Sequence, residues 1–173
     1  IGQCYPCDAI VNNVVSEYNG LGYSGTNSGG SLYITSSIFR NNKGGLAPNT
    51  LDSELLPPER ETFIIGNLIE NNNNYNSPAT NSTYLSYGNG VVIAGGNNNI
   101  IKNNVIVDHD LYGVILTAAM DVNYWPAHGN RVEENLILSS RKADIAISGV
   151  SNLANCFEGN YFNTSIPPGL QAL

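Results

Sequence analysis

The chain has 173 residues, of which 42% are hydrophobic and 12% are charged, and its formal net charge is −7. This is enough apolar material for one domain with a continuous core. The absence of a basic patch argues against a nucleic-acid partner, and no apolar stretch reaches the length of a transmembrane segment. The acidity also disfavours polyuronates, which would be repelled unless cations bridged them, whereas neutral glycans or a protein partner are compatible with it.

A short motif recurs six times: an apolar residue, two unrestricted positions, Asn (once Ser), one free position and a second large apolar residue. The copies begin at Ile10, Ile34, Ile64, Ile101, Val132 and Phe157 and end at Val15, Phe39, Ile69, Ile106, Ile137 and Phe162. Their central residues are Asn13, Ser37, Asn67, Asn104, Asn135 and Asn160. Copies that follow one another at roughly 24 to 37 residues are typical of a stacked repeat protein.

After each motif, a polar turn leads into a short apolar alternation, as in Gly113-Val114-Ile115-Leu116. Alternation with a period of two indicates strands. If these strands pair in parallel, coil upon coil, the apolar residues of the motif form two internal stacks. The Asn residues then form a ladder at the corner between the stacks, where each amide can bond both to backbone and to the next amide.

This repeat resembles the short N-x-Φ-x-N-N-x-x-G-Φ-x-Φ unit of right-handed parallel β-helix proteins. The unit is found in the pectate-lyase-like superfamily and in the periplasmic copper-maturation proteins of nitrous oxide reductase. The resemblance covers nearly the whole chain and implies an all-β fold, a right-handed parallel β-helix (solenoid) of about five to six coils. We therefore expect a single domain over residues 1–173. The resemblance says little about activity, because many activities share this scaffold.

The two ends of the repeat carry different signals. No polar capping element precedes the first coil, so we expect that N-terminal coils or a cap of a longer chain are missing, or that a partner stacks on this edge. At the other end, Ile166-Pro167-Pro168-Gly169 is expected to close the stack, because proline cannot continue a ladder.

The cysteines favour an exported protein. Cys4 and Cys7 form a C-x-x-C pair without the second pair or neighbouring His that a metal site needs, so a local disulfide or two buried thiols is expected. We accordingly expect an extracellular or periplasmic location, at the cell surface.

Three insertions interrupt the repeats, and in solenoids such insertions often build the binding face. They span residues 48–61, 71–88 and 118–129. The first and third follow the same strand of their coils and should leave the same side, while the second can lean toward them. Aromatic rings stack on sugar faces, so the candidate ligand-binding residues are Tyr84, Tyr87, Tyr124 and Trp125.

The insertions also contain candidate catalytic groups. A paired-carboxylate hydrolase needs two acids about 5 to 10 Å apart, and Asp52 with Asp121 offers such a pair. Glu54 and His128 are further candidates, and Arg131 follows the third insertion directly. The resemblance implies that a lyase would use an Arg or Lys base with Ca²⁺, for which Arg131 or Lys102 would serve. The alternative, which we favour, treats these groups as solvated loop charges with Trp125 folded down over the coil.

The cluster Asp108-His109-Asp110 offers two carboxylates that could bind Ca²⁺ if backbone carbonyls completed the shell. It aligns with Asn41-Asn42 and Asn71-Asn72, the ordinary turn residues of the repeat, so an Asx-type turn is favoured. With only two His and one Met in the chain, no metal or other cofactor is expected.

Two functional hypotheses follow. The favoured one is a non-catalytic extracellular module with a glycan-binding or structural role, whose ligand face is formed by the three insertions and whose partner is a polysaccharide or a protein. The alternative is a carbohydrate-active enzyme, a polysaccharide lyase, hydrolase or epimerase, that uses the carboxylates of those insertions.

Overall fold

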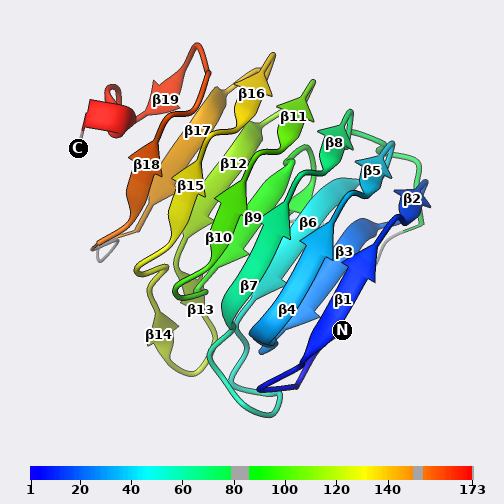
Figure 1. The fold of residues 1–173 in the computed structure, drawn as a ribbon, viewed down its shortest axis with the longest axis vertical. Helices are drawn as coiled ribbons and strands as arrows, with labels where there is room; N and C mark the ends of the chain where they lie inside the picture. Colours follow the sequence, from blue (N-terminus) through cyan, green and yellow to red (C-terminus); the bar gives the residue numbers. More distant parts are fainter. Residues whose placement is uncertain (79–85, 150–153, 173) are drawn as a thin grey trace.

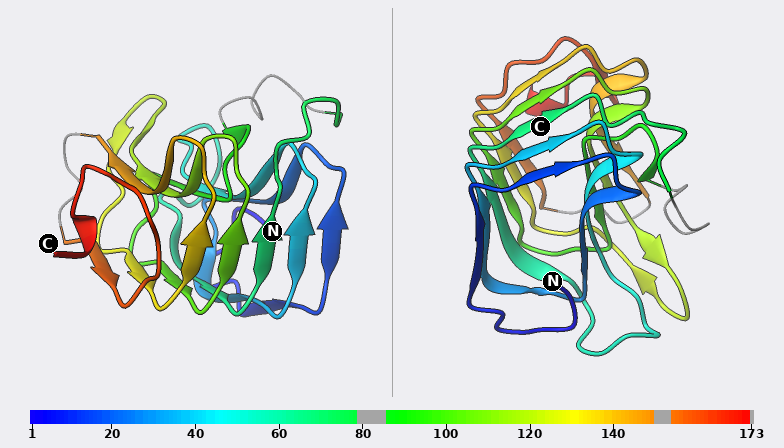
Figure 2. Two further views of the ribbon diagram at one scale, coloured as in Figure 1. Left: turned by 90° about the horizontal axis from the view of Figure 1, so that it is seen from above. Right: turned by 90° about the vertical axis from the view of Figure 1, so that its right-hand side faces the viewer.

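The computed structural model describes residues 1–78, 86–149 and 154–172. Over these residues the chain winds into a parallel β-helix with three sheets, and every coil but the last contributes a strand to each sheet (Figure 1). Seen from the N-terminal end, the chain turns clockwise as it recedes, so the helix is right-handed (Figure 2, right). The predicted fold class is confirmed.

The first sheet contains β1 (Ala9–Asn12), β4 (Gly29–Thr35), β7 (Arg60–Ile65), β10 (Ile100–Lys102), β15 (Arg131–Glu133) and β18 (Cys156–Glu158). The second contains β2 (Val15–Glu17), β5 (Ile38–Arg40), β8 (Leu68–Glu70), β11 (Val105–Val107) and β16 (Leu136–Leu138). The third contains β3 (Leu21–Thr26), β6 (Gly44–Asn49), β9 (Val91–Ala94), β12 (Tyr112–Thr117), β17 (Ala143–Ser148) and β19 (Ser165–Ile166). A small antiparallel hairpin, β13 (Ala119–Met120) and β14 (Tyr124–Trp125), projects from the third sheet's side, and a 3-10 turn, η2 (Leu170–Ala172), follows β19.

The core follows the predicted stacks from the second coil onward. In the first sheet Ile34, Ile64, Ile101, Val132 and Phe157 occupy equivalent positions. In the second sheet Phe39, Ile69, Ile106 and Ile137 do the same. All of these except Phe157 are at most 1% exposed, and burying each such side chain contributes about 1.5–3 kcal/mol before the entropic cost of ordering.

Columns of stacked amides occupy all three corners. At the first corner, between the first and second sheets, Asn104 donates its backbone N–H and its Nδ2 to Asn135 Oδ1, both at 2.9 Å. The same Nδ2 also donates to the carbonyl of Ile64 (2.9 Å), while Asn104 Oδ1 accepts from Asn67. Every polar group of this side chain is therefore satisfied although only 1% of the residue is exposed.

The first coil departs from the predicted register. Val11, not Ile10, pairs with Ile34, and Ser16, not Val15, pairs with Phe39. Ile10 and Val15 consequently face outward and are 71% and 57% exposed. The reason is that Val14 takes the corner position of Ser37, whose Oγ accepts the Val14 N–H (3.1 Å). The motif that begins at Ile10 is thus shifted by one residue, and a shift of one residue exchanges the two faces of a strand.

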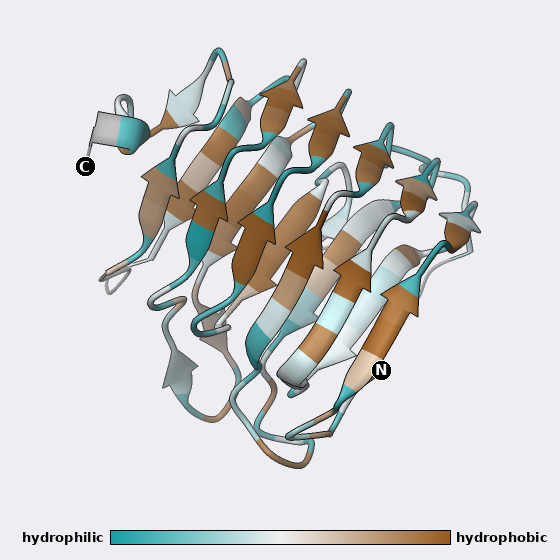
Figure 3. Ribbon diagram, in the orientation of Figure 1, coloured by the Kyte–Doolittle hydropathy of each residue, from teal (hydrophilic) through white to brown (hydrophobic). Residues whose placement is uncertain are grey.

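The outer face of the second sheet carries an apolar row that the core does not use. The strands of this sheet are largely brown in Figure 3. It consists of Val15, Ile38, Leu68, Val105 and Leu136, which pair in register along the helix axis. At the C-terminal coil, Leu170 is 2% exposed against the core, and Gln171 Oε1 accepts the Asn160 N–H (2.7 Å) at the end of the first-corner column. Among the described residues, no helix has the length and apolarity to cross a bilayer.

Candidate functional site

A groove of about 600 Å³ runs over the outer face of the third sheet. Its floor is made by outward side chains of four successive strands, β3, β6, β9 and β12, and so extends along the helix axis. These are Ser24, Ala47, Val92, Ala94, Ile115 and Thr117. The middle of the floor is apolar, with Ala47, Val92, Ala94 and Ile115, and hydroxyls lie in its first and last coils, at Ser24 and Thr117. This suits an elongated ligand that presents both apolar faces and hydroxyl groups.

All three insertions contribute to the rims of this groove. The described parts of these insertions project from the same side of the β-helix (Figure 2, right). Leu51 and Glu54 come from the first insertion, Ser86 from the second, and Ala118–Met120 from the third. The described parts of the insertions therefore converge on one face, as the order of strands and insertions predicts.

The first and third insertions are joined by a reciprocal clasp of two carboxylates. Asp52 accepts hydrogen bonds from the backbone N–H of Asn123 (2.6 Å), from Asn123 Nδ2 (2.8 Å) and from Trp125 Nε1 (3.0 Å). Asp121 Oδ2 in turn accepts the backbone N–H groups of Asp52 (2.9 Å) and Ser53 (3.2 Å). The bonds from Asn123 and then Trp125 hold the pKa of Asp52 below its usual range.

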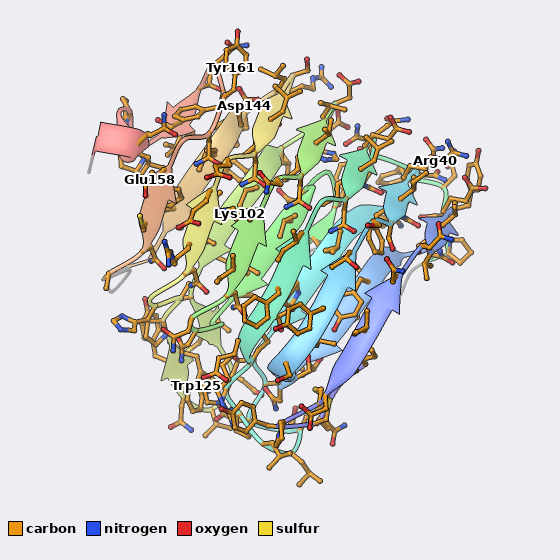
Figure 4. All side chains as sticks on the ribbon, viewed as in Figure 1. Arg40, Lys102, Trp125, Asp144, Glu158 and Tyr161 are labelled. Carbon is orange, nitrogen blue, oxygen red and sulfur yellow. A yellow bond between two sulfur atoms is a disulfide. The ribbon has the colours of Figure 1, made fainter. Side chains whose placement is uncertain are left out.

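This clasp changes the interpretation of the proposed acid pair. The structure does bring Asp52 and Asp121 together, but their oxygens bind loop N–H groups, and neither residue lines the groove. Trp125 lies where the two insertions meet, in the lower part of Figure 4. Its ring is half-buried and its Nε1 is engaged by Asp52, so it braces the rim of the groove.

The second insertion is anchored by a tyrosine cluster at the corner between the second and third sheets. Tyr87 donates its hydroxyl to Asp110 Oδ2 (2.7 Å), and Arg141 donates to Asp110 Oδ1 (3.1 Å). The Tyr75 ring meets the Tyr87 ring edge-on, with centroids 6.0 Å apart, and Lys43 Nζ lies 5.4 Å from the Tyr75 centroid. The hydrogen bond from Tyr87, followed by Arg141, lowers the pKa of Asp110, and the same bond raises the pKa of Tyr87.

The remaining predicted residues are dispersed. Glu54 lines the groove, while Arg131 lies on the first sheet, where it pairs with Glu133. His128 has an exposed side chain and continues the coil through its backbone bonds to Gly96 and Asn98. Tyr124 is 40% exposed on β14, and Tyr84 lies outside the described residues. Cys4 and Cys7 form a disulfide.

The cluster Asp108-His109-Asp110 is a turn, as expected. Asp108 has a φ of 60°, matching 55° at Asn41 and 49° at Asn71. His109 takes the place of an amide in the second-corner column, where its Nδ1 accepts the Asn72 N–H (3.4 Å). Its Nε2 is buried and makes no well-formed hydrogen bond among the described residues. Burial lowers the pKa of His109 to about 3, against a smaller opposing contribution from the backbone of Ile69.

Glu59, at the end of the first insertion, is a buried carboxyl group, and sequence reasoning did not identify its burial. It closes the first insertion by donating its backbone N–H to Thr50 Oγ1 (3.0 Å), and its side chain accepts from Thr62 Oγ1 and Asn99 Nδ2, both at 2.8 Å. Glu59 is fully buried, which raises its pKa to about 8, so the group is neutral at pH 7. Because it does not line the groove, it acts on the base of the loop and not on a ligand.

The second and third amide columns were also missed, although the sequence contains a signal for them. The spacing of 30 residues between Ser37 and Asn67 recurs between Asn42 and Asn72. At the third corner, Asn99 and Asn130 are 31 residues apart, as Asn104 and Asn135 are at the first. Searching for repeated Asn spacings, independent of apolar neighbours, would have identified both columns.

No protein-family model matches the chain, and no curated protein matches it significantly.

Proposed function

We propose that the groove on the third sheet binds an extended, neutral polysaccharide without cleaving it. We further propose that the protein acts outside the cytoplasm and that it belongs to the pectate-lyase-like superfamily. The observation that carries the proposal is the groove itself, which crosses four coils and is bordered by all three insertions. The disulfide between Cys4 and Cys7 is of a kind that persists in oxidising compartments, which supports the location.

Charge selects the class of glycan. Among the described residues that line the groove there is no Lys or Arg, and Glu54 is the single carboxylate. A polyuronate would therefore enter without a counter-charge, against a net charge of −7. A neutral glycan does not need a counter-charge. Its hydroxyls can bond to Ser24, Thr117 and Asn49, while its apolar faces lie on Ala94 and Ile115.

The same lining favours binding over catalysis. Both canonical glycoside hydrolase mechanisms use two carboxyl groups on opposite sides of the scissile bond. Asp52 and Asp121, the pair that the sequence offers, hold the two insertions together, and Glu54 stands alone at the rim. A role in assembly through a partner stacked on the first coil stays a prediction.

An array of neutral and anionic glycans, followed by titration calorimetry, tests the proposal. The Ala94→Phe variant adds a ring to the groove floor at an outward position and should weaken binding about tenfold or more. Thr35→Phe makes a similar change on the outer face of the first sheet and serves as the matched control. Equal affinities of the two variants, or preferential binding of polyuronates, would contradict the proposal.

Product assays test the enzymatic alternative on the same glycans. We expect neither new reducing ends nor unsaturated products. Turnover that is lost in Glu54→Gln would show that the groove is catalytic and that the non-catalytic proposal is wrong.

A further inference from the structure

A second, smaller pocket of about 270 Å³ lies at the corner between the second and third sheets. It is lined by one aromatic residue and four amides: Tyr18, Asn41, Asn71, Asn73 and Asn74. None of these residues lines the groove on the third sheet. The described lining of this pocket contains no ionisable carboxylate or amine.

The amides form a fixed row with unused donors. Asn71 Nδ2 donates to Asn41 Oδ1 (2.8 Å), and Asn73 Nδ2 donates to Asn71 Oδ1 (3.2 Å) and to the Asp108 carbonyl (2.7 Å). Asn73 Oδ1 accepts the Asp110 N–H (2.7 Å), which ties the row to the next coil. The Nδ2 groups of Asn41 and Asn74 have no hydrogen-bond partner among the described residues. They are therefore positioned donors that remain free for a ligand.

Tyr18 differs in residue type from the residues at the equivalent position of the other coils. Equivalent positions of this corner have φ between 49° and 63° and hold Asn41, Asn71, Asp108 and Ser139, of which the first three are residue types that tolerate the left-handed region. Tyr18 adopts the same conformation, with φ of 60°, although a bulky side chain is disfavoured there. Its side chain is 60% exposed, so little packing against the protein offsets this cost.

We propose that this pocket binds one residue of a neutral saccharide. The Tyr18 ring stacks on the apolar face of the sugar, and the free amides of Asn41 and Asn74 donate to its hydroxyl oxygens. Arg40 and its acidic neighbours do not alter the charge preference, because Arg40 is already paired with Glu17 (2.8 Å) and Glu70 (3.9 Å). The site is separate from the groove and does not depend on the groove's function.

The direct test is nuclear magnetic resonance of the ¹⁵N-labelled protein, titrated with methyl glycosides of glucose, galactose, mannose and N-acetylglucosamine, and with glucuronate as the charged probe. We expect at least one neutral glycoside to shift the side-chain NH₂ signals of Asn41 and Asn74, with a dissociation constant on the order of millimolar, as for a single shallow contact. Glucuronate should bind more weakly. Unshifted NH₂ signals with every neutral glycoside would overturn the proposal.

Variants of Tyr18 separate binding from folding. Tyr18→Ala should weaken the interaction about tenfold, whereas Tyr18→Phe should retain most of it, because the ring supplies the stacking. Tyr18→Asn places a residue suited to φ of 60° in the column, so it should raise the melting temperature and still lose binding. Retained binding in Tyr18→Asn, or lost binding in the distant exposed control Tyr161→Ala, would contradict the assignment. Loss of these NH₂ shifts in the groove variant Ala94→Phe would assign the binding to the groove instead.

Discussion

The first corner and the two corners that border the groove are built on one plan but have different contents. The first corner has an unbroken amide column from Asn67 to Asn160 and carries no insertion. At the second corner, between the second and third sheets, the column contains His109. At the third corner, between the third and first sheets, Asn99 accepts the N–H of Thr62, whose hydroxyl donates to Glu59. The three insertions leave the β-helix at those two corners.

The departures from the amide column lie at the bases of the insertions. His109 bonds to Asn72, where the second insertion begins, and Glu59 bonds through its backbone to Thr50 at the base of the first. Where an insertion replaces a regular corner, the residues at its base do not all have to be stacking amides. Buried titratable groups can occupy these positions, and they make the groove side of the molecule sensitive to pH while the first corner is not.

The largest effect is expected from breaking the first corner. Asn104→Ala removes the acceptor of the Asn67 N–H and the donor to the Ile64 carbonyl. Two buried backbone groups left without partners should cost about 2 to 5 kcal/mol of unfolding free energy, as measured by urea denaturation. Asn76→Ala, in an exposed turn, is the control and should stay within about 0.5 kcal/mol of the parent. Equal losses in both variants would show that the column does not stabilise the fold.

The acid side of the stability profile should depend on His109. Its pKa is about 3 in the folded protein and 6.5 without the fold, so between these values the unfolded chain binds a proton that the native state does not. The contribution of His109 to stability therefore decreases as pH falls through this window, by about 1.4 kcal/mol per pH unit. His109→Asn restores an amide to the column and should remove this slope. A parent and a variant with the same acid limb in pH-dependent unfolding would refute the assignment.

The alkaline side should depend on Glu59, with the opposite sign. Its pKa is about 8 when folded against 4.5 when unfolded, so the native state keeps a proton that the unfolded chain loses as pH rises through this window. The contribution of Glu59 to stability therefore decreases as pH rises, by about 1.4 kcal/mol per pH unit. Between pH 4.5 and 6.5 the two groups oppose each other, and the profile should be flat there. Glu59→Gln should abolish the decline toward pH 8, and in that variant stability should rise across the flat region.

The smallest effect on global stability is expected in the clasp between the first and third insertions. Asp52→Ala removes the acceptor of Trp125 Nε1 and of Asn123, so the rim should open locally. We expect faster amide hydrogen exchange over residues 119–125 and a red-shifted fluorescence of the single tryptophan, with little change in the melting temperature. Glu54→Ala, on the same insertion but outside the clasp, is the matched control. Cooperative unfolding of the whole domain in Asp52→Ala would show that the insertions belong to the core.

Most of the fold was predictable because its core repeats. Ile34, Ile64 and Ile101 recur in one motif, and parallel pairing brings identical positions into contact in every coil. The prediction failed in the first coil, where Val14 occupies the corner and Asn13 beside it completes a false copy of the motif. A pattern search cannot distinguish such a copy, because only the pairing of Val11 with Ile34 shows which face is buried.

The sequence by itself determined the class of fold, the axis along which the coils stack, the place of one amide column and the side from which the insertions leave. These follow from local periodicity, which every coil repeats. Only the tertiary structure decided that Asp52 and Asp121 bind loop N–H groups, that Glu59 is buried and that Tyr18 borders a row of amides. The physical reason is that these contacts join residues of different coils or loops without a shared period, for which the order of residues carries no signal.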